Sequence, residues 1–581
     1  MADRYRSPRT HSRSARQAGD APASSSGDWP RTADGSRLHA ESDAASPALF
    51  GMEWWGRWAR VAGLVLAGLW AIHFLTVPFS WDQAIFAWVG GTIVDGGLPY
   101  RDAWDIKGPL AYYVVAAAEF VFGRHEWPVR AVDLVLLAVG AAVVAALARR
   151  FRPERGAAWW GALLYVLWFA SLGYADTSQP DGWAGVLLAV AALLLARKSD
   201  ARRRPRAVAA ALAGACIGAC ALIKPTYGLF LLMPFVHGVE ASRRDGGWRA
   251  VLEATVAAGV GFVVPLGLCV AWFAHLGGLG ALHEVYILYP LRGYADLDTG
   301  WLWRVQAVTA WVLTHRFAVP LAFAVVGWRS LMTRDRPAAV LLATWCGAAF
   351  LNVIVQGQFY PYHWLPLYPP LAVLTAVGIG ALVRTVSPAR GGLPPRVARE
   401  LVAVSAGVVA LAAAFAPATT VYRWAKMLVS AQTRDAYETD EYGKNGRQRA
   451  SMYSIAQYVR AHSRAGDVVL FWGRNPGYNY LIDRPLPGRF GFTPPALDRP
   501  ANPFARPYRR EIVAAVMANR PVYVVAMTPE SCEGVTPPPT PCFTDWPEIG
   551  ALVEREYHVE RTMTVVDDSA AFRYDVMRRN R

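Results

Sequence analysis

The residues best suited to chemistry in this sequence are acids, cations and aromatic side chains in Gly- and Pro-rich stretches between apolar blocks. They are Asp82, Asp105, Lys107, Lys224, Arg292, Tyr360, Tyr362 and His363. A carboxylate can take a proton from a hydroxyl group, and cations can stabilise negative charge that develops on a departing group. These residue types could therefore supply a proton acceptor and partners for an anion.

Each of these residues also has a purely structural interpretation. Tyr, Trp and His side chains at a membrane surface often form an aromatic belt, and Lys224 can be a snorkelling anchor. Asp102 or Asp105 fits the N-cap of a helix that begins at Pro109. A functional interpretation is favoured because acids, cations and aromatics all fall in loops on the same predicted side of a membrane, and nothing comparable falls on the other side.

The composition predicts that a membrane positions these residues. Of 581 residues, 54% are hydrophobic and 18% are charged, whereas ordinary soluble domains have about 45–50% and 25%. The apolar residues form blocks long enough to cross a hydrocarbon core of about 30 Å. We predict about eleven helical spans, at residues 59–79, 128–148, 157–175, 181–196, 206–223, 225–240, 251–275, 314–328, 337–355, 363–384 and 400–418. The net charge of +15 does not indicate a nucleic-acid partner, because most of it lies in short loops between these blocks.

The basic residues also predict the orientation of the chain. Arginine-rich loops such as 149–155 and 197–206 belong on the cytoplasmic side by the positive-inside rule. This places the N-terminus in the cytoplasm and the C-terminal region outside the plasma (inner) membrane. The apolar stretch 109–122 is too short to span comfortably, so we interpret it as an interfacial helix. Asp82 directly follows the first span, where a carboxylate is costly and more often functional.

Three regions follow from these patterns. Residues 1–55 have almost no aliphatic side chains and are expected to form a disordered cytoplasmic tail. Residues 56–418 form the transmembrane domain. Residues 419–581 change character, since strand-like segments near 467–473 and 521–527 alternate with helical ones, and two final strands could pair as a hairpin. This alternation predicts an extracytoplasmic α/β domain.

The cysteines predict a structural role and no metal site. Cys532 and Cys542 flank a Pro-rich loop in the outer region, and an oxidising compartment permits a disulfide there. The other four cysteines lie within predicted spans, where they act as small apolar packing residues. No metalloprotease, paired-cysteine or Gly-rich phosphate motif appears, so no cofactor is predicted with certainty. A divalent metal near Asp82 stays open, because carboxylates alone do not select one.

The order of the motifs resembles a known family. An acid after the first span is followed by Gly-Leu-Pro-Tyr-Arg-Asp, Asp-x-Lys-x-Pro-Leu, Lys-Pro between two spans, and Gly-x-Phe-Tyr-Pro-Tyr-His before a Pro-rich span. The outer region adds Trp472-Gly473-x-x-Pro476. This order resembles the bacterial branch of glycosyltransferase family 39, in the GT-C superfamily. Relatives there include protein O-mannosyltransferases and the aminoarabinose transferases of lipid A. The resemblance covers roughly residues 55–530.

The resemblance implies a polytopic α-helical fold of the GT-C type and a membrane glycosyltransferase. Such an enzyme moves a sugar from a polyprenyl-phosphate donor to a hydroxyl of a glycan, lipid or protein, at the outer membrane face and with inversion. Asp82 is then the expected general base, and Asp105 orients Lys107 or binds the sugar or the acceptor. The groups expected to face the phosphate are Lys107, Lys224, Arg292 and His363. Tyr360 and Tyr362 are expected to stack on the sugar or the lipid head.

Two other functions remain as alternatives. A transporter or flippase of lipid-linked sugars would also have many spans, although we find no clear internal repeat and few charges within the span cores. A catalytically degenerate envelope-assembly protein is the other alternative. It rests on Gln83 and Gln358, which stand where the family commonly has an acid and an arginine.

Overall fold

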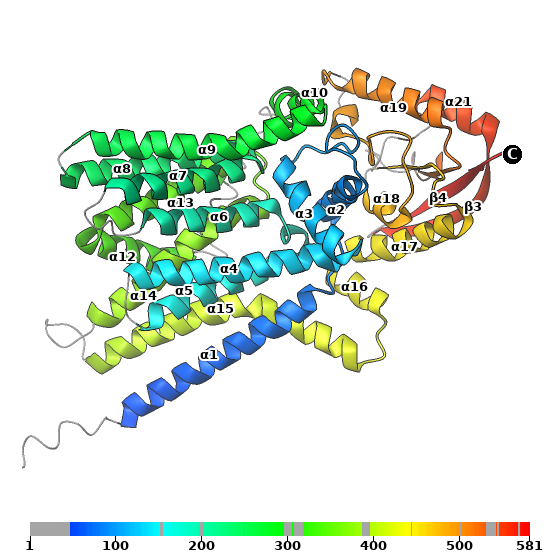
Figure 1. Ribbon diagram of the computed structural model, residues 1–581. Coiled ribbons are helices and arrows are strands. Elements are labelled where there is room, and N and C mark those ends of the chain that lie inside the picture. Colours follow the sequence, from blue (N-terminus) through cyan, green and yellow to red (C-terminus); the bar gives the residue numbers. More distant parts are fainter. Residues whose placement is uncertain are drawn as a thin grey trace, which may run out of the picture. The chain divides into compact units, whose positions relative to one another are not determined.

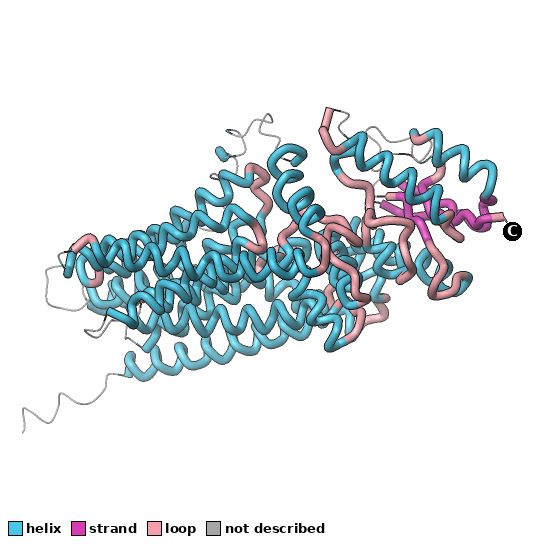
Figure 2. The backbone as a smooth tube through the Cα atoms, turned by 45° about the horizontal axis from the view of Figure 1, so that its top comes forward, coloured by secondary structure: helices cyan, strands magenta, loops and turns pink. Residues whose placement is uncertain are grey.

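The computed structural model describes most of the chain from residue 47 onwards. The residues it does not describe are 1–46, 152–154, 197–202, 246, 295–301, 303–304, 307–308, 310–317, 386–394, 443, 474, 499–500, 530, 532–541, 543–544, 568–569 and 581. Most of the predicted tail and Cys532 therefore lie outside the described residues. The chain divides into two units, Met1–Val61 and Ala62–Arg581. The second unit contains both the apolar helices and a C-terminal sheet (Figures 1 and 2).

Up to residue 429 the described chain is helical, and its backbone forms no sheet (Figure 2). The helices of this part are α1 Pro47–Phe74, α2 Trp81–Val94, α3 Pro109–Phe122, α4 Trp127–Phe151, α5 Arg155–Ala170, η1 Tyr174–Asp176, α6 Pro180–Leu195, α7 Arg203–Ala221, η2 Pro225–Leu231, α8 Leu232–Asp245, α9 Arg249–His275, α10 Leu279–Leu282, η3 His283–Leu288, η4 Pro290–Tyr294, α12 Ala318–Arg334, α13 Arg336–Gln356, η6 Pro361–Leu367, α14 Tyr368–Thr385 and α15 Pro395–Val429. In a bilayer, every backbone polar group needs a partner within the protein, which helices supply.

The described helices confirm a polytopic helical membrane fold. Each predicted span is mainly helix among its described residues, although residues 75–79, 171–173 and 222–223 lie beyond the ends of their helices. Five helical segments are long and apolar enough to cross a membrane, namely Trp127–Phe151, Arg249–His275, Arg336–Gln356, Pro361–Leu382 and Val404–Val429. The shorter apolar helices include α3, the predicted interfacial helix. It is 14 residues long and is not continuous with α2 or α4. The number of eleven spans and the orientation stay predictions.

Residues 279–294 lie between two predicted spans, and they form helix. They make up α10 and two short π-helices, η3 and η4. The reason is an apolar face: Leu282, Val285 and Tyr289 are buried in the cluster that also holds Tyr100 and Trp104. This helical segment therefore packs on the stretch between α2 and α3, which carries Asp105 and Lys107.

The C-terminal region is the expected α/β domain. Its elements are α16 Arg434–Tyr442, α17 Lys444–His462, β1 Val469–Trp472, α18 Gly477–Ile482, η7 Pro495–Asp498, α19 Ala505–Asn519, β2 Tyr523–Met527, α21 Pro547–Glu556, β3 Tyr557–Asp567 and β4 Ala570–Arg579. The strand order is β1-β2-β4-β3, with β1 parallel to β2 and the other pairs antiparallel. The last two strands form the predicted hairpin. The boundary predicted at residue 418 falls within α15, which continues to Val429.

Helices α7 and α9 approach each other closely because their contact consists of small residues. A Cβ atom added to Gly261 of α9 would overlap the carbonyl oxygen of Ala211, and one added to Gly214 of α7 would overlap that of Ala258. Small residues at a helix contact let two backbones approach within a membrane. Since α7 leads directly to Lys224 and α9 to the helical segment 279–294, this contact positions two sides of the candidate site.

The close contact yields a first test. We expect Gly261→Ala to lower the stability of the protein by roughly 1–3 kcal/mol, because the added methyl group forces the two helices apart. Gly259→Ala is the matched control, since its added Cβ meets nothing within 4 Å. Thermal unfolding of the purified variants in nanodiscs measures the difference. Equal midpoints for the two variants would contradict this packing.

Candidate active site

The start of α2 is held by Gln83, the residue that replaces an expected acid. Its Oε1 accepts hydrogen bonds from the Ser80 backbone N–H, at 2.7 Å, and from Arg130 Nη2, at 2.6 Å. Its Nε2 donates to the carbonyl oxygen of Thr177 at 2.6 Å. Gln83 is completely buried, so it has a structural role at the start of this helix. Asp82, next to it, is half-buried, and its Oδ2 accepts from Gln179 Nε2 at 3.1 Å.

A buried pair of charges on α4 fixes the segment that carries Gln179. Arg130 Nη1 donates to the hydroxyls of Thr177, at 2.9 Å, and Ser178, at 3.0 Å. Asp133 Oδ2 accepts from the backbone N–H of Ser178 at 2.7 Å. We had expected the span cores to hold almost no charge, and these two residues contradict that. Charges three residues apart within an apolar block were the signal in the sequence.

Asp105 lies in a tightly bonded loop between α2 and α3. It is buried, and the hydroxyl of Tyr112 donates to its Oδ2 at 2.5 Å. Burial raises the pKa of Asp105 to about 6, although the Tyr112 hydrogen bond and the charge of Lys107 oppose this. The N-cap of α3 is Gly108, so Asp105 does not have the capping role that was its structural alternative.

The same loop contains a strained residue. Tyr100 is completely buried and has a φ of 71°, a conformation that is unfavourable for a bulky side chain. Its hydroxyl donates to the carbonyl oxygen of Lys107 at 2.7 Å. Strained backbone persists only where surrounding contacts determine it, and it is frequent at functional sites.

The C-terminal domain supplies those contacts through Arg489. Its Nη1 donates to the carbonyl oxygen of Tyr100 at 3.0 Å, and its own carbonyl oxygen accepts from the Trp104 N–H at 2.7 Å. Its guanidinium also pairs with Glu284 at 3.0 Å and Glu511 at 2.7 Å. Arg489 therefore joins three elements at the loop: the segment 279–294, helix α19 and the loop itself.

Lys224 lies in the link between α7 and η2, and its side chain is only 14% exposed. Its Nζ is 2.8 Å from Asp181 Oδ1 and donates to Gln356 Oε1 at 2.8 Å. Burial lowers the pKa of Lys224 to about 8, although the charge of Asp181 opposes this. A buried, paired ammonium group does not fit a snorkelling anchor. Our sequence reasoning missed Asp181, whose signal was an acid in the first turn of an apolar helix.

Tyr360, Tyr362 and His363 follow a sharp turn at the end of α13, where Gly357 has a φ of 69°. Lys107 Nζ lies 5.1 Å from the centre of the Tyr362 ring, and Lys224 Nζ lies 5.4 Å from it. The ring thus attracts both cations through its π face. Tyr360 stacks on Tyr362. His363 packs edge-on against Tyr362, with ring centres 4.6 Å apart.

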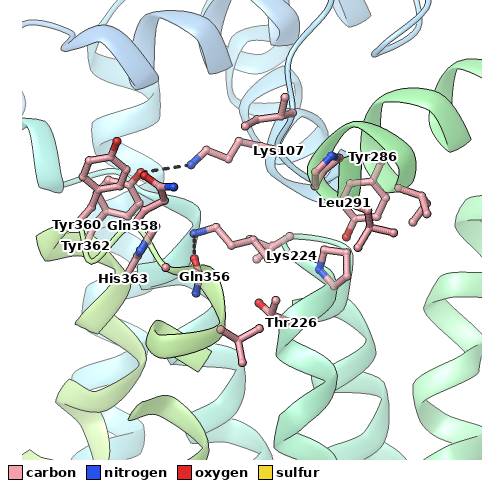
Figure 3. Close-up of a pocket in the computed structure, with 17 residues that line it drawn as sticks. Lys107, Lys224, Thr226, Tyr286, Leu291, Gln356, Gln358, Tyr360, Tyr362 and His363 are labelled. Carbon is pink, nitrogen blue, oxygen red and sulfur yellow. Dashed lines mark hydrogen bonds between the residues drawn. The ribbon is translucent and has the colours of Figure 1, made fainter. Parts of the chain in front are cut away.

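These side chains line one cavity of about 350 Å³. The residues in its lining are Ile106, Lys107, Ile223, Lys224, Pro225, Thr226, Tyr286, Ile287, Pro290, Leu291, Val355, Gln356, Gly357, Gln358, Tyr360, Tyr362 and His363. Figure 3 shows both lysines extending towards Gln358, Tyr360 and Tyr362, with Tyr286 and Leu291 on the other side. The cavity therefore brings together five of the eight residues that the sequence singled out for chemistry.

The other three, Asp82, Asp105 and Arg292, are not part of this lining. The charge of Asp82 acts on both Asp105 and Lys224, so its carboxylate lies in the same region. Arg292 is exposed on η4, while its neighbours Pro290 and Leu291 line the cavity.

Cys542 is disulfide-bonded. Within the described residues, no three His, Cys, Asp or Glu side chains are grouped as metal ligands.

The lining combines two ammonium groups with an apolar wall. None of the lining residues named above is an acid, and isoleucine, leucine, valine and proline side chains make up much of the surface. Ligand cavities typically consist of an apolar wall with a few placed polar groups that fix orientation. This arrangement suits an anionic head attached to an apolar chain.

Comparisons with known proteins identify the fold. The family model of glycosyltransferase family 87 matches residues 108–355, which is less than half of the chain. ArnT from Cupriavidus metallidurans bound to undecaprenyl phosphate is similar, with a TM-score of 0.57 and 15% identity over 90% of this chain and 98% of ArnT. The apo state of ArnT gives a TM-score of 0.59 and 14% identity, with the same coverage. No protein of curated function matches the chain.

A third solved structure is less similar. The archaeal oligosaccharyltransferase AglB from Archaeoglobus fulgidus, in complex with an inhibitory peptide and a dolichol-phosphate, has a TM-score of 0.43 and 13% identity over 89% of this chain and 74% of AglB. The predicted GT-C fold is confirmed by the likeness to ArnT. The resemblance to family 39 is not confirmed, because the matching family model is that of family 87.

The role of Arg489 can be tested without any assay of activity. We expect Arg489→Met to speed hydrogen–deuterium exchange in residues 96–107 roughly 5- to 30-fold, which corresponds to a loss of about 1–2 kcal/mol in local stability. Arg509→Met is the control, because Arg509 pairs with Glu548 and lies over Trp546 within the C-terminal domain. If both variants exchange at the wild-type rate in this segment, Arg489 does not hold the loop.

Proposed function

We propose that this protein is a membrane glycosyltransferase that moves a sugar from a polyprenyl-phosphate donor to an acceptor hydroxyl. The observation that carries the proposal is the cavity with Lys107 and Lys224 at one side and an apolar wall at the other. A polyprenyl-phosphate sugar has the matching parts, an anionic phosphate and an apolar chain. The proposal is supported by the likeness in fold to ArnT, which was crystallised with undecaprenyl phosphate.

In this proposal Asp82 is the general base. Its carboxylate lies in the first turn of α2, where the helix dipole favours negative charge, and Gln179 orients one of its oxygens at 3.1 Å. It takes the proton from the acceptor hydroxyl, whose oxygen attacks the anomeric carbon as the bond to phosphate breaks. A single displacement of this kind inverts the anomeric centre. A positioned general base contributes typically about 10²–10⁴-fold to the rate.

The two lysines stabilise the polyprenyl phosphate that departs. Fixed cations in a partly dry site lower the free energy of the negative charge that grows on the leaving group. Lys224 is held in place by Asp181 and Gln356, and the Asp105 carboxylate lies close enough to act on the charge of Lys107. Tyr360 and Tyr362 stack on the sugar or the lipid head, and His363 and Arg292 provide further contacts to the phosphate.

The setting of the reaction belongs to the same proposal. We place it at the outer face of the plasma (inner) membrane, with the C-terminal domain extracytoplasmic. The acceptor is a glycan, a lipid or a protein, and no nucleic acid takes part. A divalent metal near Asp82 would show itself as loss of transfer on treatment with a chelator.

The central test replaces the proposed base. Asp82→Asn is expected to reduce transfer by at least roughly 10²-fold, because the amide cannot accept the proton. Purified protein is given radiolabelled polyprenyl-phosphate sugar and extracted envelope acceptors in detergent, and covalent label on the acceptor is counted. Asp440→Asn, an exposed acid on α16 bonded to Gln432, is the control.

Three results would overturn the assignment. Transfer by Asp82→Asn at the wild-type rate would show that Asp82 is not the base. Movement of the labelled lipid in sealed vesicles without covalent transfer would favour a flippase. Absence of both reactions in the wild-type protein, across the envelope acceptors tested, would favour a degenerate protein.

The pKa shifts predict how transfer depends on pH. Asp105 is ionised above about 6, and Lys224 is charged below about 8. We therefore expect kcat/KM to fall as pH drops through about 6, where Asp105 is protonated, and to fall as pH rises through about 8, where Lys224 loses its charge.

The basic limb of this profile can be assigned to one residue. In Lys224→Arg the guanidinium stays charged, so the basic limb should move to higher pH even if the overall rate is lower. Lys426→Arg, an exposed residue of α15, is the control and should keep the wild-type profile. An unchanged basic limb in Lys224→Arg would assign that limb to another group.

A further inference from the structure

A second cavity, of about 530 Å³, lies between α2 and the C-terminal domain. Its lining comprises Trp88, Gly91, Thr92, Asp95, Gly97, Asp102, Arg124, Ala465, Asn479, Tyr480, Asp483, Arg484, Pro485, Leu486 and Gly488. It shares no lining residue with the cavity that holds Lys107 and Lys224. Its volume falls in the range of about 300–1,000 Å³ that is typical of small-ligand sites.

The polar groups of this cavity are held in fixed positions. Arg124 Nη1 is 2.7 Å from Asp483 Oδ1, its Nη2 donates to the carbonyl oxygen of Gly91 at 2.8 Å, and it also forms an ion pair with Asp95. The side chains of Asp95 and Asp483 remain 66% and 39% exposed. An ionised carboxylate has about four lone-pair sites, so both can accept further hydrogen bonds from a ligand.

A buried acceptor in the lining has no partner. Asn479 is 4% exposed, and its Nδ2 donates to the carbonyl oxygen of Gly491. Its Oδ1 is buried and accepts no hydrogen bond from the part of the chain that the structure describes. Buried polar atoms are almost always hydrogen-bonded, so an orphaned oxygen calls for an explanation. Because the oxygen itself is closed to solvent, a donor group on a ligand in this cavity would satisfy it only after a small movement of the Asn479 side chain.

The chemistry of the lining selects an uncharged, polyhydroxylated ligand. Its acids, Asp95, Asp102 and Asp483, are largely matched by Arg124 and Arg484, so there is no strong net charge to attract an ion. Trp88 and Tyr480 provide aromatic surface beside these groups. Sugar rings have hydroxyl edges that bond to carboxylate, amide and guanidinium groups, and C–H faces that pack on aromatic rings.

The cavity is also linked in the chain to the proposed transfer site. Asp95 is the C-cap of α2, whose first turn holds Asp82, and the helix is 14 residues long. The two ends are therefore about 20 Å apart. Asp102 belongs to the loop that carries Asp105 and Lys107. A ligand that occupies this cavity and also reaches Asp82 must therefore be extended.

We infer that this second cavity binds a neutral saccharide unit of an extended acceptor glycan. The inference of a saccharide-binding site depends only on the lining of this cavity. The inference that the saccharide belongs to the acceptor rests on the proposed function. The saccharide belongs either to a free glycan chain or to the head of a glycolipid, which offer the same hydroxyl chemistry.

Saturation-transfer difference NMR on the full-length protein tests the site. The protein is purified without glycoside detergents and placed in nanodiscs, and short neutral gluco-, manno- and galacto-oligosaccharides serve as probes. In a second arm the same oligosaccharides are presented as glycolipids in the nanodisc. Binding of the soluble probes identifies a free glycan chain, and binding only in the second arm identifies a glycolipid head.

The variants locate the binding. Asp95→Asn with Asp483→Asn should weaken binding roughly tenfold, because two charge-assisted hydrogen bonds become weaker ones. Asn tolerates the φ of 54° at position 483. Asp95→Asn alone should have a smaller effect in the same direction, and it keeps the test valid if the double variant unfolds. The control Asp440→Asn should bind as the wild type does.

Two outcomes would overturn the inference: no saturation transfer to any probe in either arm, or wild-type affinity in both cavity variants. The outcome for the proposed function is separate. A wild-type protein that binds saccharides but transfers no sugar would refute the transferase proposal and leave the binding site in place.

Discussion

The candidate site depends on one constraint, that a charge in an apolar setting must have a partner. Removing an ammonium group from water costs several kcal/mol unless an acid and hydrogen bonds compensate for it. Lys224 meets this condition through Asp181 on α6 and Gln356 at the end of α13. Tyr227 also donates to Asp181 at 2.8 Å. Three separate helical segments are therefore held around one cation, which fixes one side of the cavity.

The other side of the cavity depends on the C-terminal domain. Lys107 follows a loop in which Trp104 lies among aromatic rings from both parts of the chain, including Tyr289, Phe492 and Tyr508. The indole N–H of Trp104 donates to the hydroxyl of Tyr508 at 3.2 Å. Together with the bonds from Arg489, these contacts hold the loop against the C-terminal domain. The domain therefore completes the site, although none of its residues lines the cavity that holds the two lysines.

Much of this arrangement could be predicted from the sequence, because long apolar blocks and alternating strands have strong local signals. The helices and the α/β domain followed from those patterns, whereas five residues of the cavity lining were indicated by their chemical type and their place between the apolar blocks. What could not be predicted depends on contacts between distant residues. Gln83 resembled a lost acid until its bonds to Arg130 and Thr177 placed it in a structural network. Residues 279–294 have no periodic signal that distinguishes a π-helix from a loop.

The backbone at Tyr100 has a consequence for how the protein matures. Its left-handed conformation is unfavourable in isolation, and the contacts that impose it come from residues almost four hundred positions later, at Arg489. During synthesis the N-terminal part of a chain emerges first. The helices can thus enter the membrane and form their bundle while the loop is still unrestrained. A nascent chain would therefore reach this loop conformation only after the C-terminal domain, which begins at Arg434, had been synthesised and folded.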